Sequence, residues 1–273
     1  MIRLAVRVAR ADAEIALAEL LALAPAGVEE VDRGETIEYA VYGAPGELPA
    51  LPALRAAAGD ALVEITTTEV ADDWQTRWRA FHEPVTIGER LHVRPPWADP
   101  PDGAAGLLDI AIDPAQAFGT GAHHTTRLCL ELMLTLEPAG PLVDLGCGSG
   151  VLAIAASMLG WDPVLGVDHE AASVQATQDN AAANGVELEA HRVDLLRAAV
   201  PSATTVVANL MRPLLLHVAA AGFACEPPRV LVLSGVLTHE AGEVAQAFAR
   251  HGLHERERRH SGEWAAMTLL SHP

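Results

Sequence analysis

The stretch that decides the fold is Leu142-Val143-Asp144-Leu145-Gly146-Cys147-Gly148-Ser149-Gly150. An apolar run of strand length leads into this glycine-rich turn, and an apolar helical run begins at Val151. Glycine lets the backbone approach a ligand closely and take positive φ values that a Cβ would disfavour. A strand, a glycine turn and a helix N-terminus form the nucleotide crevice of open α/β sheets. The stretch therefore predicts a site for an adenosine-type cofactor.

Length and composition limit the class of protein. The chain has 273 residues, half of them hydrophobic, which is enough for one large domain or two of ordinary size. No apolar run reaches membrane-spanning length and no signal peptide is evident, so we expect no membrane partner. The cysteines Cys129, Cys147 and Cys225 form no CxxC pair. This spacing predicts that they are reduced thiols in a cytoplasmic protein.

The net charge indicates the kind of partner. A formal charge of −18 argues against direct nucleic-acid binding, because phosphate contacts need a basic surface. It favours a basic macromolecular partner. Residues 1–70 carry 12 acidic and 5 basic side chains, a net charge of −7. This part of the chain is therefore suited to a basic protein.

Residues 1–70 predict a small ferredoxin-like α+β domain. Apolar alternation and helical periodicity give the order βαββαβ, which is that of the ferredoxin-like arrangement. The expected strands are 2–8, 28–31, 36–42 and 61–68, and the expected helices are 11–24 and 49–58. Since no cofactor motif lies here, we expect the domain to recognise a substrate or mediate assembly.

Residues 71–106 are expected to link two domains. They hold three of the five tryptophans, at positions 74, 78 and 97, which we interpret as interdomain packing. A short helix is expected at 72–79 and a strand at 91–97, where a proline pair ends it. Residues 95–106 resemble a loop.

Residues 107–273 predict a doubly wound, mostly parallel α/β sheet. After a strand at 107–112, strand and helix signals alternate from residue 141 onward. The last two strands are separated by a short turn and are expected to pair as a hairpin, placing an antiparallel strand at the edge of the sheet. The expected strands are 142–144, 163–168, 187–193, 204–209, 230–234, 254–259 and 264–270.

The glycine spacing separates two kinds of nucleotide site. A dinucleotide fingerprint needs its third glycine at position 151, which is a valine here. The observed pattern is instead Asp-x-Gly-x-Gly-x-Gly, which resembles motif I of the class I S-adenosylmethionine-dependent methyltransferases. Asp168 ends the next strand, where a carboxylate can accept both ribose hydroxyls of either cofactor. Asp194 follows the third strand, where these methyltransferases contact adenine, although it could equally cap a helix.

Two further segments lie where polar groups can reach a ligand. Asn209 ends the fourth strand, at the edge of the sheet that faces the crevice, and its amide could accept a hydrogen bond from a substrate amine. Residues 117–127 form a loop followed by an apolar helix expected at 128–136. Hydroxyl and backbone N–H groups at a helix N-terminus can hold a carboxylate. Either segment could also serve only as a local cap or turn.

Three segments resemble one family of methyltransferases. They are Phe118-Gly119-Thr120-Gly121-Ala122-His123-His124-Thr125-Thr126, the motif at 144–150 and Ala208-Asn209-Leu210, with further matches at Asp73-Trp74 and Gly262-Glu263-Trp264. They resemble the ribosomal protein methyltransferase family PrmA over most of residues 70–270. The chain departs from that pattern after Asn209, where Pro213 comes one residue early and the bulky Arg212 precedes it.

The resemblance implies a seven-stranded methyltransferase sheet and S-adenosylmethionine as cofactor. It also implies transfer of methyl groups to lysine and amino-terminal amines of protein eleven of the large ribosomal subunit. Asn209 is the implied catalytic residue. The implied cofactor contacts are Thr126, Gly146, Asp168 and Asn209, with Phe118, Gly119, Gly121, His123 and Gly148 nearby and Asp194 at the adenine.

Other functions stay open. A related methyltransferase could act on a lysine of another protein, such as an electron-transfer flavoprotein subunit. A nicotinamide-dependent oxidoreductase or a non-enzymatic nucleotide-binding scaffold would share the glycine turn. No metal is expected, because the twelve histidines show no ligand spacing and His123 and His124 are adjacent.

Overall fold

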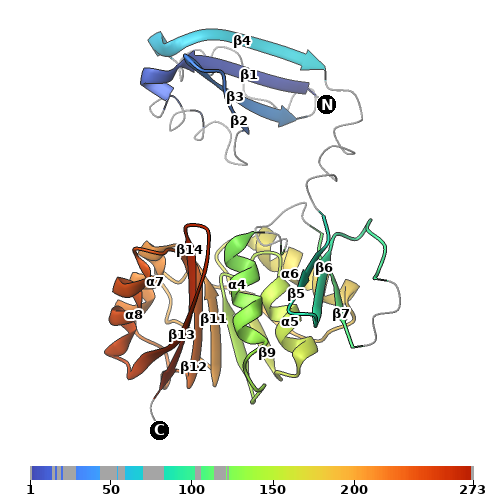
Figure 1. Ribbon diagram of the computed structural model, residues 1–273, viewed down its shortest axis with the longest axis vertical. Helices are drawn as coiled ribbons and strands as arrows, with labels where there is room; N and C mark the ends of the chain where they lie inside the picture. Colours follow the sequence, from blue (N-terminus) through green and yellow to red (C-terminus); the bar gives the residue numbers. More distant parts are fainter. Residues whose placement is uncertain are drawn as a thin grey trace. The chain divides into compact units, whose positions relative to one another are not determined.

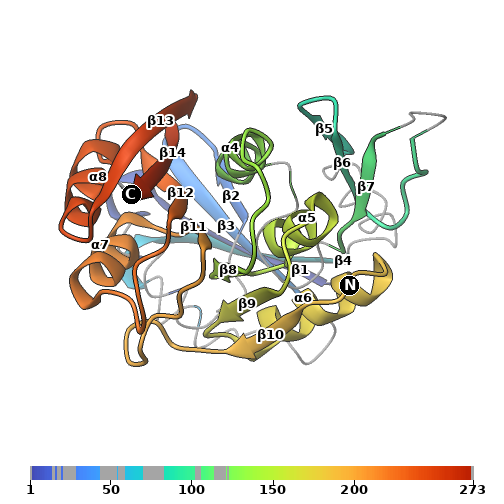
Figure 2. The same ribbon diagram turned by 90° about the horizontal axis from the view of Figure 1, so that it is seen from below.

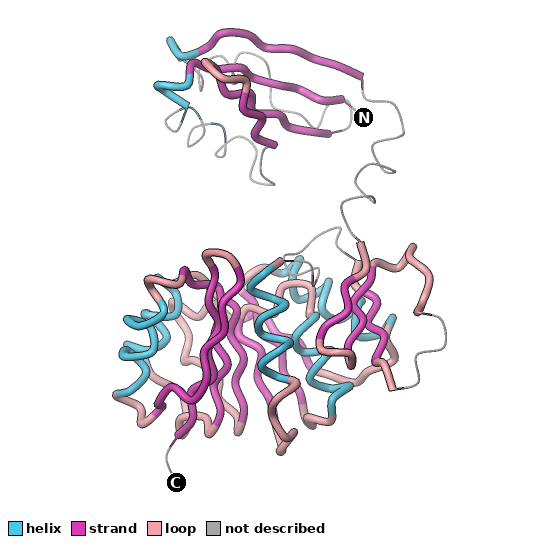
Figure 3. Tube along the Cα trace, viewed as in Figure 1, coloured by secondary structure: helices cyan, strands magenta, loops and turns pink. Residues whose placement is uncertain are grey.

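The computed structural model describes residues 2–13, 16, 20, 29–43, 54, 59–69, 83–101, 106–113, 121 and 123–271, which are coloured by secondary structure in Figure 3. The chain divides into two compact units, Met1–Phe81 and His82–Pro273. This boundary falls inside the segment 71–106 that was expected to be a linker. The helix expected at 72–79 lies outside the described residues.

The first unit contains a four-stranded antiparallel sheet. Its strands are β1 (Ile2–Ala9), β2 (Glu29–Asp32), β3 (Thr36–Gly43) and β4 (Leu62–Glu69), in the order β2-β3-β1-β4. Short 3-10 helices follow β1 at Arg10–Asp12 and precede β4 at Gly59–Ala61. The four expected strands are present, whereas the helices expected at 11–24 and 49–58 fall mostly outside the described residues.

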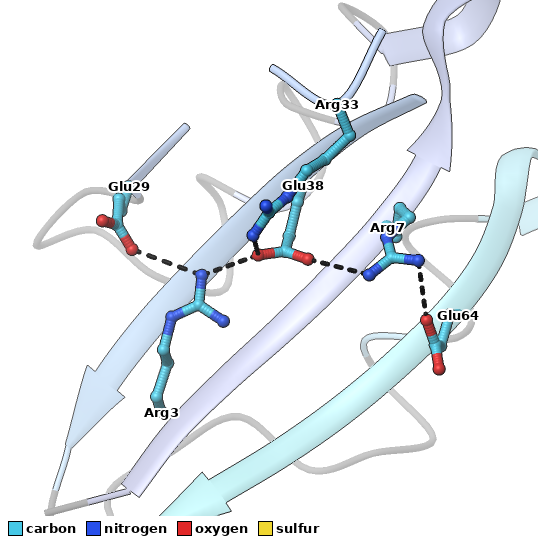
Figure 4. A network of polar contacts seen from close by, with 6 residues as sticks. All are labelled: Arg3, Arg7, Glu29, Arg33, Glu38 and Glu64. Atoms are coloured by element: carbon cyan, nitrogen blue, oxygen red, sulfur yellow. Dashed lines mark hydrogen bonds and ion pairs between the residues drawn. The ribbon is translucent and has the colours of Figure 1, made fainter. Parts of the chain in front are cut away.

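The two faces of this sheet differ because successive side chains of a strand point in opposite directions. Leu4, Val6 and Val8 face a buried apolar cluster that includes Leu20 and Leu54. The opposite face carries the ladder of charges in Figure 4, which joins Glu29, Arg3, Glu38, Arg33, Arg7 and Glu64.

Glu38 is the centre of this ladder. Its side chain is only 4% exposed and receives hydrogen bonds from Arg3 at 2.8 Å and from Arg7 and Arg33 at 3.2 Å. The hydrogen bond from Arg3 is the main reason that the pKa of Glu38 falls to about 2, with Arg33 and Arg7 adding to the effect and burial opposing it. Glu38 is therefore a buried carboxylate held ionised by three guanidinium groups.

The second unit is built on a seven-stranded sheet (Figure 1). Five parallel strands, β8 to β12, are followed by β13 and β14, in the order β10-β9-β8-β11-β12-β14-β13. The seven-stranded, mostly parallel sheet is thus confirmed. The bounds are β8 (Leu142–Leu145), β9 (Val164–Asp168), β10 (Glu189–Arg192), β11 (Thr205–Asn209), β12 (Val230–Leu237), β13 (Leu253–Ser261) and β14 (Trp264–Ser271).

The position of the antiparallel strand differs from the expectation. The hairpin forms, but the antiparallel strand is β14, which lies between β12 and β13, and β13 occupies the edge. The prediction of an antiparallel edge strand was therefore wrong. The physical reason is side-chain character: β14 is apolar and mostly buried, whereas β13 carries a run of Glu, Arg and His suited to an exposed edge.

Helices cover both faces of this sheet (Figure 2). Helices α4 (His124–Met133), α5 (Val151–Leu159) and α6 (Ala171–Ala183) contribute to one buried cluster, and α7 (Arg212–Ala221) and α8 (Ala241–Ala249) contribute to the other. Leu142 of β8 belongs to the first cluster, and Val143 and Leu145 belong to the second. Asp144 therefore points toward the face covered by α4 and α5.

A small three-stranded sheet completes the unit. It consists of β5 (Val85–Ile87), β6 (Leu91–Arg94) and β7 (Leu108–Ala111) in that order, and its apolar side chains join the cluster of α4 and α5. The strands expected near 91 and 107 are thus present, and both pack within the second unit. In the part of the chain that the structure describes, no helix is long and apolar enough to cross a membrane.

Candidate functional site

The glycine turn between β8 and α5 has a conformation that favours glycine. Gly146, Gly148 and Gly150 have φ values of +77°, +53° and +84°. A Cβ at Gly146 would lie 2.4 Å from Cδ2 of Leu210, and one at Gly150 would lie 3.0 Å from Cα of Thr177. Both backbone strain and close neighbours therefore disfavour a side chain at these positions.

Asp168 connects the end of β9 to this turn. Its Oδ2 accepts a hydrogen bond from the N–H of Gly148 at 3.1 Å, and its Oδ1 accepts one from the N–H of Glu170 at 3.0 Å. The Asp168 side chain is 11% exposed. Oδ1 also lies 3.3 Å from Nδ1 of His169. Because a carboxylate oxygen has two lone pairs, Oδ2 can accept a further hydrogen bond from a ligand hydroxyl.

Asp144 is completely buried beneath the turn, and neither of its carboxyl oxygens has a hydrogen-bond partner among the described residues. Burial raises the pKa of Asp144 to about 7; the backbone of Ala153 opposes this rise and the charge of Asp168 adds to it. Burial also raises the pKa of the Cys147 thiol to about 12 and that of Cys129 still further, with Asp144 contributing to both. Both thiols are therefore protonated at neutral pH.

The start of α4 is fixed by His123 and by the hairpin of β13 and β14. Nδ1 of His123 accepts a hydrogen bond from the N–H of Thr125 at 3.3 Å, and its ring meets that of Trp264 edge-on at 5.3 Å. Nδ1 of His124 lies 2.7 Å from Oγ of Ser261. Burial lowers the pKa of His123, with His124 adding to the effect. The helix begins four residues before the expected start at 128, so both threonines lie in its first turn.

Asn209 and Thr126 meet at the carboxyl end of β11. Nδ2 of Asn209 donates a hydrogen bond to Oγ1 of Thr126 at 3.3 Å, and Thr126 is completely buried. Oδ1 of Asn209 accepts no hydrogen bond from the part of the chain that the structure describes. The amide is thus oriented with its nitrogen toward α4 and its oxygen available to another donor.

The segment after Asn209 is packed tightly against two glycines. The side chain of Leu210 lies against Gly146, and a Cβ at Gly235 of β12 would lie 2.4 Å from the carbonyl oxygen of Leu210. Arg212, where the chain departs from the family pattern, donates a hydrogen bond to Glu243 of α8 at 2.7 Å. The shortened segment therefore follows the edge of the sheet closely.

These contacts connect the candidate residues in one series. Asp168 contacts Gly148, Gly146 contacts Leu210, and the neighbouring Asn209 contacts Thr126. The structure thus brings together the strand ends and helix starts that the sequence marked as candidates. Gly121 has a φ of +83° and packs against Val93. Phe118 and Gly119 lie outside the described residues.

Asp194 is not part of this series of contacts. Its Oδ1 accepts a hydrogen bond from the N–H of Leu196 at 3.0 Å, and its side chain is 41% exposed. The residue thus caps the turn after β10, whereas the local alternative was the cap of a helix, and part of its carboxylate is exposed. In the described part of the chain, no group of His, Cys, Asp and Glu could hold a metal ion.

Sequence reasoning missed three residues that help to shape the site. Thr177 and Asn180 of α6 donate hydrogen bonds to the glycine turn, and Trp264 contacts His123. Apolar periodicity does not mark the first two, because the buried face of α6 is mostly polar and consists of Ser173, Thr177, Asn180 and Ala181. Trp264 was named from the sequence only as part of the family resemblance and was given no role.

A family model described as ribosomal protein L11 methyltransferase (PrmA) matches residues 50–271. The chain belongs to this family. Among the PrmA relatives, the ribosomal protein L11 methyltransferase of Burkholderia multivorans is 36% identical over 277 residues, with 91% of each chain covered. That of Geobacter metallireducens is 40% identical over 203 residues, covering 74% of this chain and 67% of the relative.

The PrmA assignment agrees with a solved structure. A ribosomal protein L11 methylase from Lactobacillus delbrueckii subsp. bulgaricus matches with a TM-score of 0.62 and 27% identity. The match covers 70% of this chain and all of that one. The fold of the second unit is therefore that of a methyltransferase with a mostly parallel central sheet.

Proposed function

We propose that this protein transfers methyl groups from S-adenosylmethionine to lysine side-chain and amino-terminal amines of ribosomal protein L11. The observation that carries the proposal is the Asn209–Thr126 hydrogen bond beside the glycine turn. It places an oriented amide oxygen next to a backbone suited to an adenosine-type cofactor. The names of the 36–40% identical relatives support L11 as the substrate over another protein.

The residues present fit S-adenosylmethionine. The turn takes positive φ values that leave no room for side chains at Gly146 and Gly150, and Asp168 retains acceptor capacity for ribose hydroxyls. We assign Gly146, Gly148 and Asp168 to the cofactor, with Asp194 at the adenine. Thr126 and Asn209 would hold its methionine end, near Phe118, Gly119, Gly121 and His123.

When bound, S-adenosylmethionine supplies an electrophilic methyl group on a sulfonium. Asn209 provides the acceptor that orients the attacking amine, since its Oδ1 can receive an N–H of the substrate while its Nδ2 stays on Thr126. Because methyl transfer is an in-line displacement, positioning can supply about 7–11 kcal/mol of the acceleration.

The amine must lose a proton before it can attack. Thr126, the described residue to which the Asn209 side chain donates, is not an evident base, and His123, three residues earlier, accepts a hydrogen bond from the helix start. Desolvation disfavours the charged form of an ammonium group and lowers its pKa. We therefore assign deprotonation to burial of the substrate amine, with water as the acceptor.

The first unit is assigned to substrate recognition. Its strand order and antiparallel pairing support a ferredoxin-like domain within residues 1–70, followed by a linker at 71–106 and the methyltransferase domain at 107–273. Its net charge of −7 suits a basic ribosomal protein, and the net charge of the whole chain argues against direct nucleic-acid binding. We place the protein in the cytoplasm, in keeping with its reduced cysteines.

Calorimetry distinguishes this function from that of a nicotinamide-dependent enzyme. The full-length protein is titrated with S-adenosylhomocysteine and, separately, with NAD. The proposal expects saturable binding of S-adenosylhomocysteine and none of NAD. Tight binding of NAD alone would contradict it, and cofactor binding without methyl transfer to any basic protein would indicate a non-enzymatic scaffold.

A further inference from the structure

Helix α6 presents two buried polar side chains to the glycine turn. Thr177 is completely buried and Asn180 is 4% exposed, and both lie on the face of α6 whose Ala181 joins the apolar cluster. Buried polar groups need hydrogen-bond partners, because leaving them unsatisfied is costly. Both side chains donate to carbonyl groups of the turn and not to groups within α6.

The two side chains hold successive carbonyl groups. Oγ1 of Thr177 donates to the carbonyl oxygen of Gly148 at 3.0 Å, and Nδ2 of Asn180 donates to that of Ser149 at 2.8 Å. On the other side, the N–H of Gly148 donates to Asp168. In a trans peptide the C=O and N–H groups point in opposite directions. Fixing these two carbonyls toward α6 therefore directs the N–H groups of Ser149 and Gly150 away from it. The N–H of Gly150 donates to the carbonyl oxygen of Cys147 at 2.8 Å and so closes the turn.

The glycines alone would not hold the turn in this conformation. Glycine has the largest backbone freedom of any residue, so three glycines in five residues need restraint from elsewhere. Thr177 supplies part of it by contact as well, because its Cγ2 and Cα lie 2.9 and 3.0 Å from the position of a Cβ at Gly150. The helix thus packs directly against the turn.

The same helix also holds the end of β7. Oδ1 of Asn180 accepts a hydrogen bond from the N–H of Asp113 at 3.0 Å, so one amide connects the glycine turn to the segment after β7. One helical turn later, Asn184 pairs with both the N–H and the C=O of Ala111, at 2.8 and 2.7 Å. Asn180 therefore contacts two separate segments through its two polar atoms.

We propose that Thr177 and Asn180 are positioning residues for S-adenosylmethionine: by holding the carbonyls of Gly148 and Ser149 they fix the conformation of the glycine turn that is assigned to the cofactor. This inference rests on the proposed function and assigns part of the cofactor affinity to α6, outside the residues that contact the ligand. Neither residue is expected to touch the substrate amine.

The test compares Thr177→Val, Thr177→Ser and Asn180→Ala in the full-length protein. Valine keeps the branched shape and the methyl group against Gly150 but loses the hydroxyl, whereas serine keeps the hydroxyl. Gln178→Ala is the matched control, because Gln178 on the same helix donates to a carbonyl outside the site, that of Ala190, at 3.2 Å. The readouts are the Kd of S-adenosylhomocysteine by calorimetry, and KM and kcat with L11 as substrate.

Thr177→Val and Asn180→Ala are expected to raise the Kd and the KM for S-adenosylmethionine about tenfold, with kcat at saturating cofactor nearly unchanged. Thr177→Ser is expected to restore most of the affinity, and Gln178→Ala to match the wild type. Should Asn180→Ala not fold, Asn180→Asp carries the same expectation, because it keeps the acceptor for Asp113 and loses the donor to Ser149.

Wild-type Kd and KM in both Thr177→Val and the Asn180 variant, even with lowered thermal stability, would show a purely structural role and overturn the inference. Failure of Thr177→Ser to restore affinity would also contradict it. If the wild type itself bound no S-adenosylhomocysteine, the proposed function would fail and this inference with it, which is a different result from the first.

Discussion

Nδ2 of Asn209 donates a hydrogen bond to Oγ1 of Thr126 across 83 positions of sequence, at 3.3 Å. The contact joins the end of β11 to the first turn of α4, and Leu210, the next residue, lies against Gly146 of the glycine turn. Because Thr126 is completely buried, its hydroxyl holds the amide in one orientation. The proposed aiming of the substrate amine depends on that orientation.

Substitutions of Asn209 and Thr126 should distinguish the loss of the hydrogen-bond acceptor from the loss of its orientation. Asn209→Ala removes the acceptor for the amine, so we expect kcat/KM to fall about 100-fold or more. Thr126→Val keeps the side-chain shape and removes only the hydroxyl, so a fall of about tenfold is expected. Steady-state kinetics with L11 measures both, with Gln178→Ala as control. Wild-type kcat/KM in Asn209→Ala would show that the amide does not aim the substrate.

Gly146→Ala should disturb the site through Leu210. The new Cβ would lie 2.4 Å from Cδ2 of Leu210, at a φ of +77°. Gly185→Ala is the matched control, because Gly185 has a φ of +64° and nothing lies within 4 Å of its Cβ position. Placing an alanine at a positive φ by itself costs about 1–2 kcal/mol of stability. Both variants should lose this stability in urea unfolding, but only Gly146→Ala should also weaken binding of S-adenosylhomocysteine. Equal binding by the two variants would contradict the proposed importance of the Leu210 contact.

The buried Asp144 should make stability depend on pH near neutrality. Its pKa of about 7 in the folded protein lies above the ordinary value of 3.8, so between these values the native state holds a proton that the unfolded state has lost. Stability from this group is therefore present at low pH and is lost as pH rises toward 7. Relative to Asp144→Asn, the wild type should lose about 1 kcal/mol per pH unit between pH 5 and 6.5. Urea unfolding at several pH values measures this, and parallel curves for the two proteins would refute the assignment.

Glu38 should have the opposite dependence. Its pKa is lowered from 4.5 to about 2, so its contribution is complete above pH 4.5 and is lost as pH falls toward 2. At pH 7, Glu38→Gln should destabilise the first unit by about 2–3 kcal/mol, because three arginines lose a charged acceptor. Glu64→Gln, which affects a single half-exposed ion pair, should cost about 1 kcal/mol or less. Hydrogen exchange of the β1 and β3 amides reports both effects, and equal protection in the two variants would argue against the special role of Glu38.

The sequence predicted what depends on local pattern. The apolar runs at 142–144 and 204–209 predict buried parallel strands, and the glycines that follow the first run predict the turn, because each signal lies within a few residues. The hairpin of β13 and β14 was predicted, but the antiparallel strand was expected at the edge, whereas it lies next to β12 because β14 is the more apolar of the two. Thr177 and Asn180 were missed because their partners are carbonyls about 30 residues away, and a carbonyl leaves no trace in the sequence.

The most direct test of the account is to incubate the full-length protein with L11 and isotopically labelled S-adenosylmethionine, and to map the label by mass spectrometry. We expect labelled methyl groups on lysine side chains and the amino-terminal amine of L11, with the amount strongly reduced in Asn209→Ala. An unlabelled L11, under conditions where the protein binds S-adenosylhomocysteine, would contradict it.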